Sequence, residues 1–414
     1  MNKKLIFFFL TSMIIAAGCS KPSPEKTTEY NSTSEPILIG DLSSYSLGAA
    51  ITAPAGWGFK AAVADINKKS GVLGRPLKLI SRDDLGNPAD AIRQADELFN
   101  REGVVLLIGC NAAHIELAIS EYAKQNKKLF VSACTNSDEF MWAKGHRYAF
   151  RAGGPPVYVF NRMLAERAAK QGKRRWATVN HNYAWGQSNL AAFRENLGDF
   201  DAEVTWVAEH WPSVGKLDAG ATVQSILNEK PDAIYTSLWG ADLTAFVREG
   251  NKRGLFEGRL LVGDQLTRPE TIEQLGLEIP EGVLGFSVPL MLDTGIDGVN
   301  QLAVQYHSST GKNLRHTALM GYHTIQVIAN AIEAAKSTNT ETLVDTLEGF
   351  KTETLLGEVE IRKIDHHGTV GVWIGETGTE KGTRQFLDWD FKDGKDYFPP
   401  DDYILNLRNA SIKQ

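Results

Sequence analysis

The stretch VVLLIGCNAAHIELAISEYAK, residues 104–124, decides the fold class. It opens as an uninterrupted apolar run, which is typical of a strand covered on both faces of a parallel sheet, and it closes as an amphipathic helix. The strand turns into the helix over residues 109–113, without a linker. The first N–H groups of a helix have no partner inside that helix. The turn therefore offers free backbone donors, and the sequence raises the question of what they bind.

The same alternation of strand and helix extends in both directions. The apolar runs PILIGDL and RPLKLISRDD precede this stretch, each followed by a helical pattern, and the run KKLFVSAC comes after it. The alternation restarts at RYAFRAGG and continues through RRWATVN, PDAIYTSL and GRLLVGDQ. Near the C-terminus, GEVEIRKIDHHGTVGVWIGETG and TRQFLDWDF instead read as antiparallel strands. Strands that alternate with helices predict an α/β protein with parallel sheets, and the restart predicts two lobes.

Length, charge and cysteine content narrow the class of protein. A chain of 414 residues agrees with two domains, and a formal net charge of -6 argues against a nucleic-acid partner. Three cysteines are too few for a disulfide framework. Cys110 and Cys134 nevertheless end consecutive strands, so we expect them to lie close in space. Whether they form a disulfide bond stays open at this point.

The N-terminus reads as a targeting segment, residues 1–18. Two lysines precede the apolar run LIFFFLTSMIIAAG, which is shorter than the ~20 residues of a membrane-spanning helix. The run ends in IAAGC, which resembles a bacterial lipobox and implies cleavage before Cys19 and acylation of that residue. The alternative is an ordinary signal peptide with a chance cysteine. Residues 19–36, rich in Ser, Thr, Pro and Glu, predict a flexible tether, so the folded part is expected outside the cytoplasmic membrane.

Several of these stretches carry a family resemblance. They are AAVADINKKSGVLGRPLKLISRDDLGNP, VVLLIG with its helix, KKLFVSACTN, YAFRAGG and YAWGQS. In them the chain resembles the leucine-binding-protein family, the type I periplasmic substrate-binding proteins of ABC importers. The resemblance implies two doubly wound parallel-sheet lobes, residues 37–153 with 289–352 and residues 154–288 with 353–414. It further implies a three-strand hinge near residues 151–154, 287–290 and 351–355, and a ligand held in the cleft between the lobes.

The resemblance assigns a role to the free donors of the first lobe. Ligands of open α/β sheets bind outside the carboxyl ends of the strands, and a helix N-terminus suits an anion. We therefore expect Ala112 and Ala113, together with Cys134, Thr135 and Asn136, to hold a ligand carboxylate. Family members have hydroxyl side chains at these turns, whereas this chain has two alanines and keeps only the backbone donors at the first turn. Thr135 or Asn136 is left to supply a side-chain donor, while the neighbouring His114 is expected to face solvent.

In the second lobe, the resemblance places two tryptophans over the ligand. Trp185 in YAWGQS and Trp239 in SLWGAD each follow a strand and precede a helix, although plain packing is the alternative for both. The family often has an acidic residue after the LLVG strand that pairs with a ligand ammonium. Here Gln265 stands at that position, beside Asp264. This departure leaves open whether the ligand is an amino acid, an amide, or an organic or aromatic acid.

The remaining motifs do not favour an enzyme. GWGFKA matches a dinucleotide-binding pattern, but it does not directly follow a strand. The histidine pair in DHHG, residues 365–368, has no third partner at metal-ligand spacing and reads as a polar turn, and Asp83 and Asp84 read as capping, solvated residues. We therefore expect no catalytic residue, no metal and no cofactor.

Two functions fit these observations. The first is a lipid-anchored protein of the cell envelope, on the periplasmic or extracytoplasmic side, that captures a small amino acid or an apolar or aromatic carboxylate for an ABC permease. The second is a ligand sensor on the same scaffold that takes no part in transport. Its membrane contact would be the lipid anchor alone.

Overall fold

The computed structural model describes residues 34–200, 203–289 and 294–412. The predicted signal peptide, Cys19 and most of the predicted tether lie outside these residues, as does Leu290 of the second predicted crossover.

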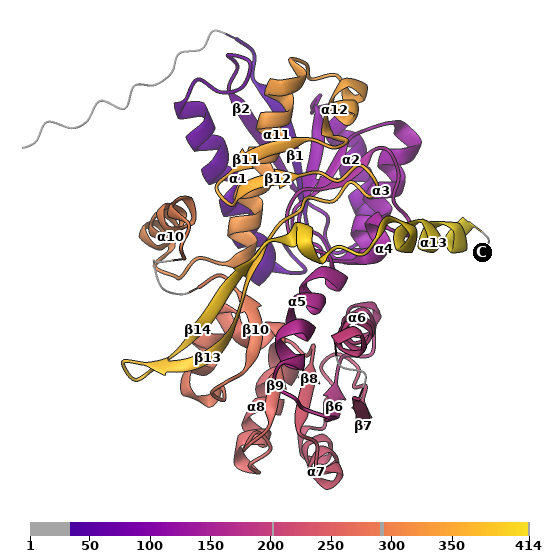
Figure 1. The fold of residues 1–414 in the computed structure, drawn as a ribbon. Coiled ribbons are helices and arrows are strands. Elements are labelled where there is room, and N and C mark those ends of the chain that lie inside the picture. Colours follow the sequence, from indigo (N-terminus) through magenta and orange to yellow (C-terminus); the bar gives the residue numbers. More distant parts are fainter. Residues whose placement is uncertain (1–33, 201–202, 290–293, 413–414) are drawn as a thin grey trace, which may run out of the picture. The chain divides into compact units, whose positions relative to one another are not determined.

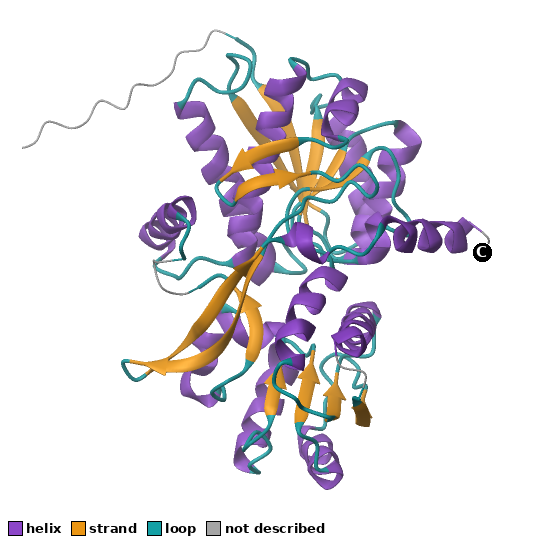
Figure 2. Cartoon of the chain, viewed as in Figure 1, coloured by secondary structure: helices purple, strands orange, loops and turns teal. Residues whose placement is uncertain are grey.

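The first sheet has five parallel strands in the order β2-β1-β3-β4-β5 (Figures 1 and 2). The strands are β1 (Ile37–Ser43), β2 (Leu77–Asp83), β3 (Leu106–Gly109), β4 (Phe130–Ser132) and β5 (Ala149–Arg151). The helices that go with this sheet are α1 (Ala49–Lys68), α2 (Pro88–Asn100), α3 (Ala113–Asn126), α4 (Asp138–Met141), α11 (His316–Ala335) and α12 (Thr340–Leu347). This arrangement confirms the predicted α/β class.

Helices cover both faces of this sheet because successive strand residues point to opposite sides. Ile39 and Ile108 belong to one core cluster with α1, α11 and α12, whereas Leu107 belongs to another with α2 and α3. Helices α1 and α11 lie side by side (Figure 1). Their approach requires a glycine at position 58, because a Cβ atom there would lie 2.1 Å from the carbonyl oxygen of Ala318.

The second sheet has seven strands in the order β14-β13-β10-β9-β8-β6-β7. They are β6 (Arg175–Val179), β7 (Thr205–His210), β8 (Ala233–Thr236), β9 (Leu260–Val262), β10 (Leu284–Ser287), β13 (Val372–Glu380) and β14 (Thr383–Lys392). Strands β6 to β10 are parallel, while β13 runs antiparallel to both β10 and β14. The antiparallel tail predicted from the sequence is thus confirmed, and it makes the second sheet mixed rather than wholly parallel.

Helices also cover both faces of the second sheet. Its helices are α5 (Val157–Ala169), α6 (Ala184–Phe200), α7 (Ala219–Glu229), α8 (Gly240–Lys252), α9 (Pro269–Leu275) and α10 (Asp297–Thr310), with 3-10 turns at Asp264–Thr267 and Gly276–Glu278. Helices α5 and α6 share one core cluster, and α7, α8 and α10 share another. Helix α10, which we assigned to the first lobe, also contacts α1 of that lobe, because the Tyr306 ring meets Trp57 edge-on with centroids 4.7 Å apart.

Residues 351–355, the third predicted crossover, begin with a short strand. Strand β11 (Lys351–Thr354) pairs with β12 (Gly357–Glu360) in a hairpin, which reverses at Gly357 with a φ of +88°. A positive φ of this kind favours glycine. The segment that runs beside the end of β5 comes later, because Arg151 N–H donates to His366 O at 3.0 Å and Gly368 N–H donates to Arg151 O at 2.7 Å.

A buried charged cluster lies at this contact. The Arg151 guanidinium lies 3.4 Å from Glu116 Oε2, donates to Ser137 O at 2.9 Å and approaches His367 Nε2 at 3.5 Å. Arg151, Glu116 and His367 are all fully buried. Burial raises the pKa of Glu116, and the Arg151 cation opposes that rise. The DHHG stretch, predicted as a polar turn, is therefore buried against the end of the first sheet.

The last helix, α13 (Asp401–Ile412), follows a 3-10 turn at Gly394–Tyr397 and has no counterpart in the sequence prediction. It belongs to the segment 353–414 that we assigned to the second lobe. Arg408 donates to the carbonyls of Met141 and Trp142, at 3.2 and 3.1 Å. Tyr403 OH donates to Glu195 of α6 at 3.3 Å. This helix thus contacts residues from both predicted lobes.

Candidate ligand-binding site

A disulfide bond joins the ends of two neighbouring strands of the first sheet. Cys110 follows β3 and Cys134 follows β4, and their Cα atoms lie 4.9 Å apart. Strands β3 and β4 are adjacent, with Gly109 opposite Ser132. The predicted proximity of the two cysteines is confirmed, and the question left open is answered by a bonded pair. The bond ties together the two turns that we predicted to hold a carboxylate.

The turn after β3 keeps backbone donors free. Ala112 precedes α3 and offers no side-chain cap to the first helical turn, and its own N–H donates to Ser44 Oγ at 3.3 Å. Among the described residues, none accepts a hydrogen bond from the N–H of Ala113 or His114. His114 is exposed, as predicted. The positive end of the α3 dipole and these donors suit a carboxylate.

The turn after β4 uses its polar side chains on the protein itself. Thr135 Oγ1 donates to Asn111 O at 2.8 Å, and Asn136 Nδ2 donates to Pro155 O at 2.5 Å. Each of the two residues is half-buried. Thr135 and Asn136 therefore hold the turns in place, and the donors left to an anion are chiefly those of the backbone.

Sequence reasoning missed a row of hydroxyl groups at the carboxyl end of β1. Ser43 Oγ donates to Asp41 at 2.7 Å and accepts the N–H of Cys110 at 3.1 Å. Ser44 Oγ donates to Asp84 Oδ2 at 2.6 Å. The signal was present, because the serines in DLSSYS stand at the carboxyl end of a strand that neighbours β3.

Asp84 departs from its predicted role as a solvated residue. It is fully buried and accepts hydrogen bonds from Ser44, from Asn111 Nδ2 at 2.8 Å and from the N–H of Gly86 at 2.8 Å. The neighbouring Asp83 accepts from the N–H groups of Ser46 and Leu85, at 3.3 and 3.0 Å. Both carboxylates are used to brace the loop after β2.

In the second sheet, Trp239 forms an aromatic group with residues that follow β6. Its indole N–H donates to Tyr183 OH at 3.0 Å, and its ring meets His181 edge-on with centroids 5.4 Å apart. Trp239 and Tyr183 are 41% and 39% exposed, so both offer ring surface to a ligand. Tyr183 was not among the predicted site residues, although it stands two residues before Trp185 in the stretch YAWGQS.

The buried carboxylate of Asp242 holds the His181 ring of this aromatic group. His181 Nε2 lies 2.8 Å from Asp242 Oδ2, and Asp242 also accepts from the N–H of Gly215 at 2.6 Å. Burial alone would raise the pKa of Asp242, but these hydrogen bonds hold it below its usual value. The ionised carboxylate therefore fixes the His181 ring against which Trp239 packs.

Trp185 is placed differently from Trp239. It lies in the first turn of α6, is half-buried, and its ring contact is with Phe160, at 6.3 Å between centroids. Phe160 contacts Phe286 of β10 in turn, at 4.7 Å. Trp185 is therefore anchored on the core of the second sheet, and part of it remains exposed.

Asp264 and Gln265 follow β9 in a 3-10 turn. Asp264 is buried, accepts from Gln265 Nε2 at 2.5 Å and lies 3.4 Å from the Arg268 guanidinium. Burial raises the pKa of Asp264, and Arg268 opposes the rise. Arg268 is itself buried, 4.1 Å above the Phe286 ring. Asp264 thus has a partner of opposite charge within the protein.

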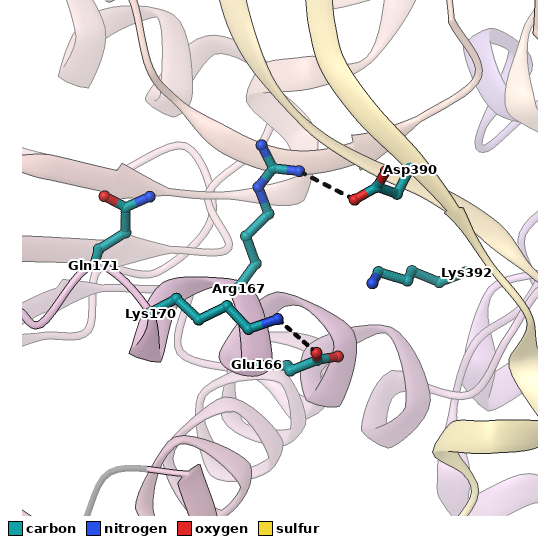
Figure 3. A pocket seen from close by; sticks show the side chains of 6 residues that line it. All are labelled: Glu166, Arg167, Lys170, Gln171, Asp390 and Lys392. Carbon is teal, nitrogen blue, oxygen red and sulfur yellow. Dashed lines mark hydrogen bonds and ion pairs between the residues drawn. The ribbon is translucent and has the colours of Figure 1, made fainter.

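A shallow hollow lies elsewhere on the second sheet, between α5 and β14 (Figure 3). Its volume is about 200 Å³, and it is lined by Glu166, Arg167, Lys170, Gln171, Asp390 and Lys392. Lys170 pairs with Glu166 at 2.8 Å and Arg167 approaches Asp390 at 3.8 Å (Figure 3). None of the predicted ligand residues lines this hollow, and its charges largely pair with one another.

Two features are absent from the described residues. No group of three or more His, Cys, Asp or Glu side chains there could hold a metal ion. No helix in the same ranges combines the length and apolar character needed to cross a bilayer.

Comparison with known sequences decides the family. The sequence model of the family described as periplasmic binding protein matches residues 36–383. The chain belongs to the periplasmic binding protein family. This membership confirms the predicted resemblance, including the expectation of a binding protein rather than an enzyme.

Named relatives of this periplasmic binding protein are distant. A Leu/Ile/Val-binding protein of Rhizobium johnstonii is 27% identical over 43% of the chain and 47% of the relative. A Leu/Ile/Val-binding protein of Escherichia coli is 23% identical over 48% of the chain and 53% of the relative. The chain thus spans about half the length of these curated relatives. A Leu/Ile/Val-binding protein homologue of Brucella melitensis is 23% identical over 72% of the chain and 80% of the relative.

Solved structures agree with the fold of this family. A leucine-, isoleucine-, valine-, threonine- and alanine-binding protein from Brucella ovis matches with a TM-score of 0.79 at 20% identity, covering 89% of the chain and 97% of the structure. A solute-binding protein of an ABC transporter from R. palustris, solved with 4-hydroxybenzoate, matches with a TM-score of 0.75 at 20% identity, covering 89% and 98%. Both likenesses support the type I periplasmic-binding-protein fold.

Proposed function

We propose that this periplasmic binding protein captures a small apolar or aromatic carboxylate, or an amino acid, between its two lobes and delivers it to an ABC importer. The observation that carries the proposal is the pair of turns after β3 and β4, linked by Cys110 and Cys134, with free backbone donors at Ala113 and His114. The second support is the exposed pair Trp239 and Tyr183 at the strand ends of the other sheet. A carboxylate on the donors and an apolar body on the aromatic rings would engage both lobes.

Such a division of contacts has a thermodynamic consequence. A ligand that contacts both lobes binds the closed state better than the open state, and this difference in affinity drives closure. The names of relatives support the ligand class, because they are binding proteins for branched-chain amino acids and one neighbour was solved with 4-hydroxybenzoate.

The aromatic contact can be tested by substitution. Trp239→Ala should weaken ligand binding by about tenfold or more, because an aromatic hot spot contributes about 1–3 kcal/mol. Trp185→Ala should weaken binding as well, and should also lower the melting temperature, because Trp185 packs on Phe160. Isothermal titration calorimetry and tryptophan fluorescence measure both effects.

Phe200→Ala is the matched control for this test. Phe200 is 40% exposed, close to the 41% of Trp239, but it ends α6, the helix that begins at Ala184. A 17-residue helix is about 25 Å long, so Phe200 lies far from the first turn. Its removal should leave affinity unchanged. Unchanged affinity in both tryptophan variants would refute the proposed position of the ligand.

We also propose that the protein is anchored to a membrane through acylated Cys19. The small residues before Cys19 and the polar stretch after it support this reading. Cys19→Ala should move the protein from the membrane fraction to the soluble fraction after cell lysis and centrifugation. A variant that still sediments with membranes would contradict the anchor.

Delivery to a transporter is separable from sensing. Deletion of the gene should abolish uptake of the radiolabelled ligand if the protein serves an importer. If uptake continues and only a cellular response to the ligand is lost, the protein is a sensor.

A further inference from the structure

We infer that the ligand is a carboxylate without an α-ammonium group, and that the turn after β9 makes this distinction. The inference rests on the proposed function and narrows its ligand class. Its basis is the state of the acidic side chains at the strand ends, each of which is already committed to a partner within the protein.

In the second sheet, the acid at the turn after β9 is neutralised internally. Burial raises the pKa of Tyr183, the hydrogen bond from Trp239 opposes this rise, and the Asp264 carboxylate adds to it. Asp264 also stands at the carboxyl end of β9, the parallel neighbour of the strand β8 that Trp239 follows. Yet it is buried, with Arg268 at 3.4 Å, so that the pair carries no net charge toward a ligand.

Arg268 is not free to move aside. It is buried, its guanidinium stacks 4.1 Å above Phe286, and Pro269 follows it at the start of α9. Stacking of a desolvated guanidinium on an aromatic ring is favourable, which adds to the cost of displacing it. A ligand ammonium would have to compete with this fixed cation for Asp264.

Three other strand-end carboxylates are committed too. Asp242 holds His181 and the N–H of Gly215, and Asp84 holds Ser44, Asn111 and Gly86. Asp41 is buried and accepts hydroxyl groups from Ser43 and Tyr45, each at 2.7 Å. Within the part of the chain that the structure describes, each of these strand-end acids is buried and already hydrogen-bonded. A buried ammonium without such a partner is costly.

Gln265 completes the distinction. Its amide Nε2 donates to Asp264, which leaves the carbonyl Oε1 as a neutral acceptor on a half-buried side chain. This neutral oxygen can accept a hydrogen bond from a ligand hydroxyl, or it can stay unpaired. It does not carry the negative charge that a ligand ammonium requires. Free N–H donors in the first sheet and neutral polar groups in the second match an apolar or aromatic acid, with or without a hydroxyl.

Matched ligand pairs test the inference on the unmodified protein. We expect 4-methylpentanoate to bind at least about tenfold more tightly than L-leucine, and 3-phenylpropanoate more tightly than L-phenylalanine, in calorimetric titrations at pH 7. Each pair differs only in the α-ammonium group. Equal or tighter binding of the amino acids would overturn the inference and leave the proposed function standing. Binding of no member of either pair would overturn both.

A gain-of-binding variant locates the distinction. Gln265→Glu should raise the affinity for the amino acid of each pair by about tenfold and lower that for its deaminated partner, because it supplies a carboxylate at the turn. Gln274→Glu adds the same charge on an exposed residue of α9 and should change neither affinity. A gain of affinity cannot arise from misfolding. If Gln265→Glu leaves the ratio of affinities unchanged, the turn after β9 does not select the ligand.

Discussion

Replacing Arg151 by methionine should lower the free energy of unfolding by about 3–5 kcal/mol. The substitution leaves Glu116 buried without its cation, since Arg151 lies 3.4 Å from Glu116 and both are fully buried. Removing one partner of a buried ion pair lowers the free energy of unfolding by far more than the intact pair adds to it. The reason is that the remaining charge has lost both its hydrating water and its counter-ion. Urea titration followed by circular dichroism measures the change.

Two comparisons isolate this cause. Arg147→Met removes an arginine just before the same strand, whose partners Glu341 and Asp345 are exposed at the surface, and it should change stability little. The double variant Glu116→Gln/Arg151→Met should recover much of the loss, because the glutamine carries no charge. A double variant as unstable as Arg151→Met alone would contradict the role of Glu116.

The loss should also depend on pH. Burial raises the pKa of Glu116 above its unfolded value, and removal of Arg151 removes an opposing influence. A raised carboxyl pKa in the folded state means that the folded protein binds the proton more tightly than the unfolded chain does. The stabilisation of the folded state by protonated Glu116 is therefore fully present below the unfolded pKa of about 4.3 and is lost as the pH rises. The Arg151→Met defect should be smaller at pH 5 than at pH 7.

Opening the disulfide bond should produce the second largest loss, about 3 kcal/mol. Cys110 and Cys134 are separated by 24 residues, and a cross-link over such a loop restricts the unfolded chain. The double variant Cys110→Ser/Cys134→Ser should also bind the ligand more weakly, because the two turns that present backbone donors are no longer tied.

Reductant provides the control for this prediction. Dithiothreitol should lower the melting temperature of the parent protein and leave that of the double serine variant unchanged. Titration of two free thiols in the folded, non-reduced protein would contradict the bonded pair.

The alternation of strands and helices was sufficient to predict the class, the two sheets and the antiparallel tail. Periodicity and apolar runs carry that information locally. The proximity of Cys110 and Cys134 followed from the same logic, because the carboxyl ends of neighbouring parallel strands meet at one edge. The family resemblance supplied the predicted bounds of the two lobes and the hinge between them, which periodicity alone does not contain.

What failed depended on contacts between distant segments. The hairpin at residues 351–360 was not predicted, because residues 351–354 read equally well as a connecting strand, and the pairing with Gly357–Glu360 shows the hairpin. Asp84 was read as solvated, although Ser44 and Asn111 bury it from two other loops. Tyr183 was missed because its place in the site depends on its hydrogen bond with Trp239, which is 56 residues away in the sequence.

The close packing of α1 against α11 sets the order in which the first lobe can be completed. Its five strands are all made by residue 151, but Ile39 and Ile108 are covered by a helix that begins only at His316. Once the ribosome has synthesised the five strands, this face of the sheet therefore lacks α11 and α12 and is covered only by α1 for some 165 further residues. The N-terminal part of the first lobe is therefore not expected to fold independently of the later helices. A gene fragment ending near residue 153 would encode a sheet that exposes apolar surface, and proteins of this kind aggregate during expression.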